Sequence, residues 1–242
     1  MSHIDVFKRY EYKYLLSPED KKELLIALRG HMMPDEYGRT TIRNVYYDTP
    51  DYSLIRTSLE KPVYKEKLRV RSYCRVNEDD NVFVEIKKKY KGIVYKRRTA
   101  VREHQAESWL SGVSPEPYIS QIADEIEYFR RIHKDLKPAC FLSYERESFR
   151  AVDGTCLRLT LDENILGRSR DMSLTRNAYG DRILPPGSTL LELKTAGSIP
   201  LYLAKFLGSR GISRTSVSKY GTYYSNFIRT SDRTKEGGLL YA

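Results

Sequence analysis

The chain has little of what several common folds and sites require. Three cysteines in 242 residues, widely spaced at Cys74, Cys140 and Cys156, suggest neither a disulfide framework nor a CxxC metal site. Its four histidines show no ligand spacing, and it has no glycine-rich loop of the Walker type. No apolar run approaches the length of a membrane span, and the N-terminal residues are too polar for a signal peptide. These absences argue against a P-loop nucleotide site, and we expect a cytoplasmic chain that does not insert into a membrane.

Positive charge is what the chain has in excess. Lys and Arg number 42 against 32 Asp and Glu, a formal charge of +10. Such an excess favours an anionic partner: nucleic acid, a phosphorylated small molecule or an anionic membrane surface. Twenty tyrosines against one tryptophan, Trp109, are typical of a β-rich protein. A chain of this length can bury a real core, as one large β-rich domain or as two small ones.

Residues 63–101 contain three short segments whose side chains alternate with period 2, the pattern of β-strands. Polar or glycine-bearing turns at 77–81 and 91–92 separate the segments, and most apolar residues fall on one face. The other face carries Lys65, Lys67, Arg69, Arg71, Phe83, Glu85, Lys87, Lys89, Val94, Lys96 and Arg98. Like charges opposite each other destabilise a sheet, so this face suggests a polyanion. A solvated sheet face is the simpler interpretation of this stretch alone.

Other segments predict further strands with helices between them. Ser17-Pro18-Glu19-Asp20 offers a serine cap, a proline at the first helical position and acids in the first turn. Asp153-Gly154 predicts a hairpin, and 164–188 predicts a loop. Strands are expected at 6–16, 40–48, 139–150, 155–162 and 189–194, and helices from Ser17 to about Gly30, from Thr49 to about Ser58, and at 103–111, 118–135, 200–207 and 218–228.

The later strands repeat the alternation. Tyr144 and Arg146 share a face, as do Glu192 and Lys194; Arg158 shares one with Thr160 and Asp162. We therefore expect an α+β fold: an antiparallel β-barrel tunnel of about eight strands with helices packed outside. If the charged face points inward, the tunnel suits polyphosphate. Without an internal repeat or a convincing boundary, we expect a single tunnel domain at 1–229 and a flexible C-terminal tail at 230–242.

The ordered motifs resemble the polyphosphate polymerase (VTC) domain family, within the triphosphate tunnel metalloenzyme (CYTH-like) superfamily. Each motif alone is weak, but their ordered combination over nearly the whole chain is specific. The matching pieces are RYEYKYLL at 9–16, YYDTPDY at 46–52, KLRVRSY at 67–73, VFVEIKKKYKGIVYKRR at 82–98, SYERESF at 143–149, LRLTLDENI at 157–165, LLELK at 190–194 and SKY at 218–220.

This resemblance implies a metal-dependent polymerase that transfers the γ-phosphate of ATP to a growing polyphosphate chain. Glu192 matches the glutamate that holds Mn²⁺ or Mg²⁺, and Glu85 and Glu11 lie where related tunnel enzymes place metal-binding or water-activating glutamates. For Glu85, an ion pair with Lys87 or Arg71 is an equal alternative. The implied catalytic residues are Lys13, Arg69, Arg71, Lys87, Arg146 and Arg158, and the implied substrate-binding residues are Lys96, Arg98, Tyr144, Lys194, Ser218 and Lys219.

Elementary chemistry agrees with this resemblance. Phosphoryl transfer requires mainly that phosphate oxygens be positioned and neutralised, which Arg forks and Lys point charges do well. The chain departs from the family at Ser216, where a lysine is expected, and Arg214 is a candidate substitute. The N-terminal inositol-polyphosphate-sensing domain and the C-terminal membrane helices of eukaryotic assemblies are also missing from this sequence. Coupling to translocation would then need a membrane-protein partner.

Two other classes of function stay open. With water as the nucleophile, the same tunnel would be a tripolyphosphatase or nucleoside triphosphatase, with Glu11 or Glu85 orienting the water. Without catalysis it would be a polyanion-binding module. Nucleic acid is the less favoured polyanion, because its binding needs basic and aromatic residues on one open groove. Here the basic residues and the tyrosines mostly alternate onto opposite faces.

Overall fold

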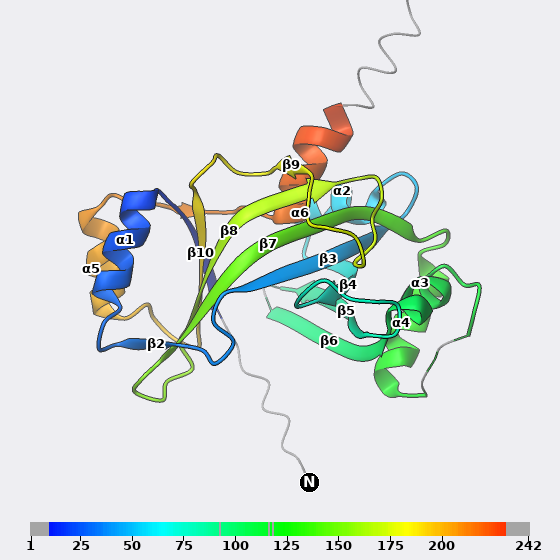
Figure 1. The fold of residues 1–242 in the computed structure, drawn as a ribbon, viewed down its shortest axis with the longest axis horizontal. Coiled ribbons are helices and arrows are strands. Elements are labelled where there is room, and N and C mark those ends of the chain that lie inside the picture. The colour runs from blue at the N-terminus through cyan, green and yellow to red at the C-terminus, as the bar shows by residue number, and fades with distance from the viewer. Residues whose placement is uncertain (1–9, 92, 116, 118, 231–242) are drawn as a thin grey trace, which may run out of the picture. The chain divides into compact units, whose positions relative to one another are not determined.

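The computed structural model describes residues 10–91, 93–115, 117 and 119–230 (Figure 1). The expectations for residues 6–9, for Gly92 of the second turn and for 231–242 of the tail lie outside the described residues. The strands are β1 Tyr10–Leu16, β2 Met32–Pro34, β3 Thr40–Asp48, β4 Tyr64–Ser72, β5 Asn81–Tyr90, β6 Ile93–Arg102, β7 Lys137–Ala151, β8 Arg158–Arg168, β9 Asp181–Arg182, β10 Thr189–Thr195 and β11 Arg214–Thr215. The helices are α1 Pro18–Ala27, α2 Ser53–Leu59, α3 Glu103–Leu110, α4 Gln121–Ile132, α5 Leu201–Ser209, α6 Lys219–Tyr223 and the π-helix η1 Tyr224–Ile228.

The chain divides into two compact units. The first unit comprises Met1–Thr41, Tyr144–Ile165 and Leu184–Val217, and the second comprises Ile42–Ser143, Leu166–Ile183 and Ser218–Ala242. The long strands β7 and β8 contribute residues to both units. In the first unit the strand order is β11-β1-β10-β8-β7, and β2 also pairs with β7. In the second unit it is β7-β3-β4-β5-β6, and β9 pairs with β8.

Within the described ranges these pairings form one antiparallel sheet of eleven strands rather than about eight; the short strands β2, β9 and β11 were not predicted. Among the described residues its strand order is a path with two ends, β11 and β6. The predicted fold class, an α+β chain with an antiparallel sheet and helices packed against it, is confirmed. No helix within the described residues is both long and apolar enough to cross a membrane.

The core of the first unit lies between the sheet and helices α1 and α5, which contact each other (Figure 1). Helix α1 begins as predicted: Ser17 Oγ accepts from the Asp20 amide at 3.0 Å, and the Asp20 carboxylate accepts from the Ser17 amide at 3.3 Å. Leu191 and Leu193 are fully buried, and burying a leucine stabilises a fold by about 1.5–3 kcal/mol. Because side chains alternate along β10, Glu192 and Lys194 must point to the other face.

The core of the second unit lies between β3 to β6 and the helices α3 and α4. Val84 and Ile86 of β5 are buried together with Trp109 of α3 and Phe129 of α4. This burial fixes the register of the sheet, since a slip by one residue would move every apolar side chain to the opposite face. The charged side chains of β4 to β6 are therefore held on one face.

Two segments differ from the expectation. Strand β8 continues to Arg168, well into the segment predicted as a loop. Asn164 has a φ of 48°, in the left-handed region, and this local break interrupts the period-2 pattern by which the strand would be recognised. The predicted helix at 218–228 is instead a short α-helix, α6, that continues as the π-helix η1.

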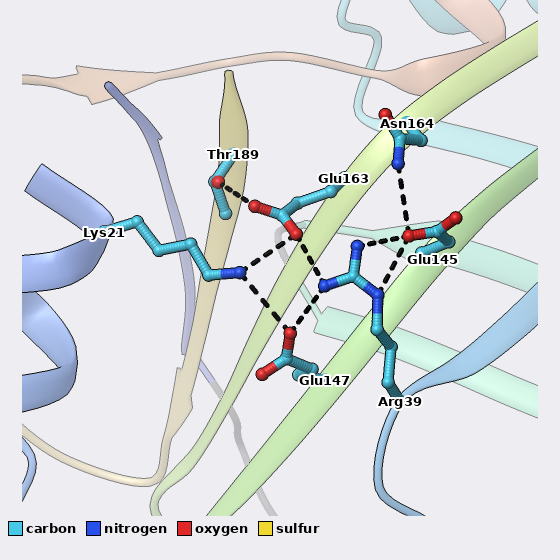
Figure 2. Close-up of polar contacts among 7 residues, drawn as sticks. All are labelled: Lys21, Arg39, Glu145, Glu147, Glu163, Asn164 and Thr189. Atoms are coloured by element: carbon cyan, nitrogen blue, oxygen red, sulfur yellow. Dashed lines mark hydrogen bonds and ion pairs between the residues drawn. The ribbon is translucent and has the colours of Figure 1, made fainter. Parts of the chain in front are cut away.

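A network of charged side chains joins several elements of the first unit (Figure 2). Arg39 Nη1 lies 2.8 Å from Glu147 and 2.9 Å from Glu163, and Lys21 Nζ lies 2.9 Å from Glu163. Glu145 also pairs with Arg39. Through these contacts α1 and the residue before β3 are tied to β7 and β8, on the face opposite Arg146 and Asp162.

Candidate active site

The predicted site residues of the first unit gather on the polar face of its sheet. Residues directly opposite in an antiparallel ladder point to the same side. Glu11, Lys194 and Arg158 form one such row across β1, β10 and β8, and Lys13, Glu192 and Thr160 form the next. With Tyr144, Arg146 and Asp162 they make up what we call the Glu192 cluster. The predicted alternation of these strands is confirmed.

Glu192 is buried, with 7% of its surface exposed, between two cations. Its Oε1 lies 3.4 Å from Lys13 Nζ, and its Oε2 lies 3.4 Å from Arg146 Nη2. Lys13 Nζ also lies 3.5 Å from Glu11 Oε1 and donates to the carbonyl of Val217 at 3.0 Å. Lys13 therefore lies between the carboxylates of Glu11 and Glu192.

Arg146 is held rigidly by a residue that the sequence did not single out for the site. Its Nε and Nη2 lie 2.6 and 2.7 Å from the two oxygens of Asp162, which is fully buried. Its Cζ lies 5.1 Å from the centre of the Tyr144 ring. Burial opposes the charge of Arg146, but Tyr144, Asp162 and Glu192 outweigh burial and raise its pKa well above the usual range. The guanidinium is thus a fixed charge with a fixed orientation.

The Glu192 cluster fits a hard divalent cation bound through few protein ligands. Its oxygen donors are Glu192, Glu11 and Thr160, and the buried Oγ1 of Thr160 makes no hydrogen bond within the described part of the chain. That part contains no group of three or more His, Cys, Asp or Glu placed to enclose an ion. Mg²⁺ and similar cations commonly use one or two carboxylates, while phosphates and water complete the shell. An all-protein cage does not fit.

The predicted site residues of the second unit gather in the Glu85 cluster, on the polar face of β3 to β6. The ladder places Tyr46, Arg69, Glu85 and Arg98 in one row. The next row consists of three lysines, Lys67, Lys87 and Lys96, and another contains Asn44, Arg71 and Phe83. The sequence-based assignment of all these basic residues to one face is confirmed.

Glu85 is the counter-ion of this cluster. Only 1% of its side chain is exposed, and it lies 2.7 Å from both Arg69 Nη2 and Lys96 Nζ and 3.8 Å from Arg71 Nε. Burial raises the pKa of Glu85, but the three cations outweigh burial and lower the pKa to about 2. Burial also lowers the pKa of Lys96 to about 8, against the opposing effect of Glu85. The geometry therefore favours the ion-pair interpretation of Glu85.

Several side chains orient the basic residues of the Glu85 cluster. Asn44, fully buried, accepts from Arg71 Nε at 2.9 Å, and the Tyr46 hydroxyl lies 3.0 Å from Arg69 Nη1. Lys67 Nζ lies 3.1 Å from Oγ of Ser218, the N-cap of α6, which begins at Lys219. Arg98 Cζ lies 4.7 Å from the centre of the Phe83 ring. Asn44 and Tyr46 were not predicted, because a strand pattern shows a shared face but not a hydrogen bond.

Arg214 does not take the role suggested for it. It lies in β11 opposite Tyr14, whereas Lys13 lies opposite Thr215. Its side chain therefore belongs to the face opposite the Glu192 cluster, and its Cζ lies 4.4 Å from the centre of the Tyr12 ring. Within the described part of the chain, Arg214 is therefore not placed to substitute for the lysine expected at Ser216.

A known structure shares the fold. A protein from Bacillus halodurans, described as a "putative adenylate cyclase", matches at a TM-score of 0.53 and 17% identity, over 87% of this chain and 95% of that one. At this identity the likeness shows the fold alone. A protein from Vibrio parahaemolyticus with the same description gives a TM-score of 0.41 at 12% identity, over 88% and 96% of the two chains. That second likeness is too weak to support an argument.

Sequence comparison identifies the family. The VTC domain matches residues 8–228, so this chain belongs to the VTC domain family. The resemblance inferred from the ordered motifs is therefore confirmed. Over 188 residues the chain is 27% identical to the vacuolar transporter chaperone complex subunit 4 of Schizosaccharomyces pombe. This match covers 66% of the chain but only 26% of that relative, so the chain spans about a quarter of its length.

Proposed function

We propose that the chain is a divalent-metal-dependent phosphotransferase that moves the γ-phosphate of ATP onto a polyphosphate chain. The observation that supports it best is the burial of Glu192 between Lys13 and Arg146, beside an unpaired hydroxyl, on a polar sheet face. Membership of the VTC domain family and the relative from a vacuolar transporter chaperone complex agree with it. A cytoplasmic location and a membrane-protein partner remain predictions.

In the Glu192 cluster the cations would bind phosphate oxygens. Asp162 occupies the Nε and Nη2 edge of Arg146, so a phosphate would approach its Nη1 end. Lys13, Arg158 and Lys194 supply further positive charge on the same face. When bound at Glu192, with Glu11 and Thr160 as neighbouring oxygen donors, Mn²⁺ or Mg²⁺ would neutralise charge on the phosphates.

In the Glu85 cluster the cations would bind phosphates in the same way, with Glu85 offsetting part of their charge until a polyanion arrives. Arg forks suit bidentate phosphate binding, and the lysine row supplies point charges. Hydroxyl and ammonium groups at the start of α6 would add donors. The proposed set is Arg69, Arg71, Lys87, Lys96 and Arg98, with Ser218 and Lys219.

The proposed reaction is an in-line displacement. A terminal phosphate oxygen of the growing chain attacks the γ-phosphorus of ATP, and a new P–O bond forms. The bond between the γ-phosphorus and the bridging oxygen breaks, and its electron pair leaves with ADP. Because the nucleophile is already an anion, no side chain has to remove a proton. This agrees with two clusters that contain no histidine.

Hydrolysis is the second candidate, and Glu11 is the observation that favours it. Glu11 is 30% exposed and lies 3.5 Å from Lys13, so its carboxylate could orient a water molecule. Glu85 suits that task less well, because it is buried and paired with several cations. A water nucleophile would release free phosphate instead of lengthening a chain.

The experiment incubates the protein with ATP and Mn²⁺ or Mg²⁺, resolves polyphosphate on a stained gel and assays free phosphate in parallel. Glu192→Gln is compared with Glu147→Gln, which changes a glutamate on the opposite face of β7 from Arg146. We expect a ladder of long chains that Glu192→Gln abolishes and Glu147→Gln retains. Free phosphate without a ladder would identify a hydrolase. If neither polyphosphate nor free phosphate forms with either metal, the enzymatic proposal is refuted.

A further inference from the structure

Two residues in the sequence motifs have no role in the site as described so far. Asp48 belongs to YYDTPDY and ends β3, and Tyr220 belongs to SKY and lies in the first turn of α6. They are 172 positions apart in the sequence, yet the Tyr220 hydroxyl donates to Asp48 Oδ2 at 2.9 Å. Both are buried, with exposures of 0% and 2%. Such a contact joins the two motifs directly.

Asp48 is a rigid anchor for this hydrogen bond. Its carboxylate also accepts from the backbone amides of Thr49 and Leu54 at 2.9 Å and of Ile55 at 3.0 Å. Leu54 and Ile55 lie in the first turn of α2, whose N-cap residue makes no capping side-chain hydrogen bond. Asp48 therefore supplies the missing cap, and charge-assisted bonds of this kind are short and strong. Its carboxylate cannot rotate away without uncapping α2.

The start of α6 depends on contacts of this kind. Even with the π-helix η1 that continues it, α6 belongs to a helical segment too short to be stable through its own hydrogen bonds. Besides the bond to Asp48, it packs closely on α2: a Cβ on Gly221 would lie 2.9 Å from Leu59 Cδ2. Ser218 and Lys219 directly precede Tyr220 in the chain, so the place of Tyr220 determines theirs.

The same anchor reaches Arg69. The rings of Tyr220 and Tyr46 are stacked, with centres 4.9 Å apart and planes inclined by 25°. The Tyr46 hydroxyl accepts from Arg69 Nη1 at 3.0 Å, and Arg69 pairs with Glu85. A continuous set of contacts thus runs from Asp48, the cap of α2, to the Arg69 guanidinium in the Glu85 cluster.

We propose that Asp48 and Tyr220 are positioning residues for phosphate binding. Their buried hydrogen bond fixes Ser218 and Lys219 at the start of α6 and, through Tyr46, the orientation of Arg69. Neither residue touches the substrate. This inference rests on the proposed function, because it assumes that the Glu85 cluster binds phosphate.

The test compares Tyr220→Phe with Tyr223→Phe. Tyr223 lies in the same helix, is 3% exposed, and directs its hydroxyl to Asp181 Oδ2 at 3.5 Å. Each variant loses one buried hydroxyl, but only Tyr220→Phe breaks the contact with Asp48. Affinity for tripolyphosphate is measured by calorimetry, and exchange of the Gly221 and Thr222 amides is measured by NMR. Both amides bond to Ser218.

We expect Tyr220→Phe to weaken tripolyphosphate binding about fivefold to tenfold, the effect of losing one buried hydrogen bond. Tyr223→Phe should stay within about twofold of the wild type. Amide exchange at Gly221 and Thr222 should accelerate in Tyr220→Phe and not in the control. Asp48→Asn combined with Tyr220→Phe should lose less binding than the sum of the two single losses, since both changes act on the same contact.

Equal losses in the two tyrosine variants, or an additive double variant, would overturn the proposal. If the wild type does not bind tripolyphosphate at all, the proposed function fails instead. Amide exchange then still tests whether the bond between Asp48 and Tyr220 holds the start of α6. Unchanged exchange in Tyr220→Phe would show that Asp48 does not hold the start of α6.

Discussion

The most direct test of the electrostatic account is Glu85→Gln, which keeps the shape of the side chain and removes its charge. In the wild type this carboxylate lies 2.7 Å from Arg69 and Lys96 and 3.8 Å from Arg71. The variant would leave these cations beside one another without a counter-ion. We expect it to be less stable than the wild type but to bind a polyanion more tightly.

The magnitude follows from the pKa of Glu85. A carboxyl group with a pKa near 4.5 in the unfolded chain and about 2 in the folded protein contributes about 3 kcal/mol of stability at neutral pH. Removing one partner from a buried ion pair costs about 3–5 kcal/mol, which agrees. Because the folded pKa is the lower one, this contribution is complete above pH 4.5 and is lost as the pH falls towards 2.

The assay is urea denaturation of wild type and variant at several pH values, with and without tripolyphosphate. Glu66→Gln is the matched control, because Glu66 lies in the neighbouring strand β4, on the opposite face of the sheet, and pairs with His133 at 3.3 Å. Without ligand, Glu85→Gln should lose about 3 kcal/mol, and tripolyphosphate should restore part of the loss. Glu66→Gln should bind tripolyphosphate no more tightly than the wild type does. A Glu85→Gln protein that is as stable as wild type, or that binds tripolyphosphate more weakly, would refute the counter-ion account.

Three further predictions address the other polar groups. Thr160→Val should change stability by less than about 0.5 kcal/mol in urea denaturation, because no hydrogen bond is lost. A metal titration should nevertheless show that the variant needs a higher Mn²⁺ concentration for ATP turnover. Tripolyphosphate affinity should fall as the pH rises past about 8, where Lys96 loses its charge, and Lys96→Arg should remove this dependence in calorimetry. Glu163→Gln should cost about 1–2 kcal/mol in urea denaturation at neutral pH, since Glu163 bonds Lys21 and Arg39. Burial raises the pKa of Glu163, but its bonds to Lys21 and Thr189 outweigh burial and lower it, so that difference should persist in mild acid and shrink only as the pH falls below the ordinary range of a glutamate.

The faces of the strands could be predicted because a strand has a side-chain period of 2 and one face must be buried. Lys13, Glu192 and Arg158 were assigned to the polar face for this reason, and the ladder brings that face together. The start of α1 was equally predictable, because Ser17 and Asp20 satisfy each other within four residues. Local rules were sufficient wherever the partners are close in the sequence.

Contacts between distant segments could not be predicted in this way. The bond from Arg146 to Asp162 depends on the register of β7 against β8, and the bond from Tyr220 to Asp48 joins residues 172 positions apart. The pattern also failed where the backbone departs from a regular strand, as at Asn164 in β8. Period 2 identifies which side chains share a face, but the register decides which of them touch.

The two clusters share a feature that bears on how they would bind a polyanion. Each contains a buried glutamate paired with cations: Glu192 with Lys13 and Arg146, and Glu85 with Arg69 and Lys96. A row of three lysines, Lys67, Lys87 and Lys96, adds repulsion that the sheet must bear. A bound polyanion relieves this repulsion in the folded state, whereas in the unfolded chain the same cations are dispersed. Ligand binding must therefore stabilise the fold, by about 2.7 kcal/mol at a ligand concentration of 100 Kd. Salt screens exposed charges but not the buried carboxylates. Rising salt should therefore weaken polyanion binding far more than it weakens the internal ion pairs.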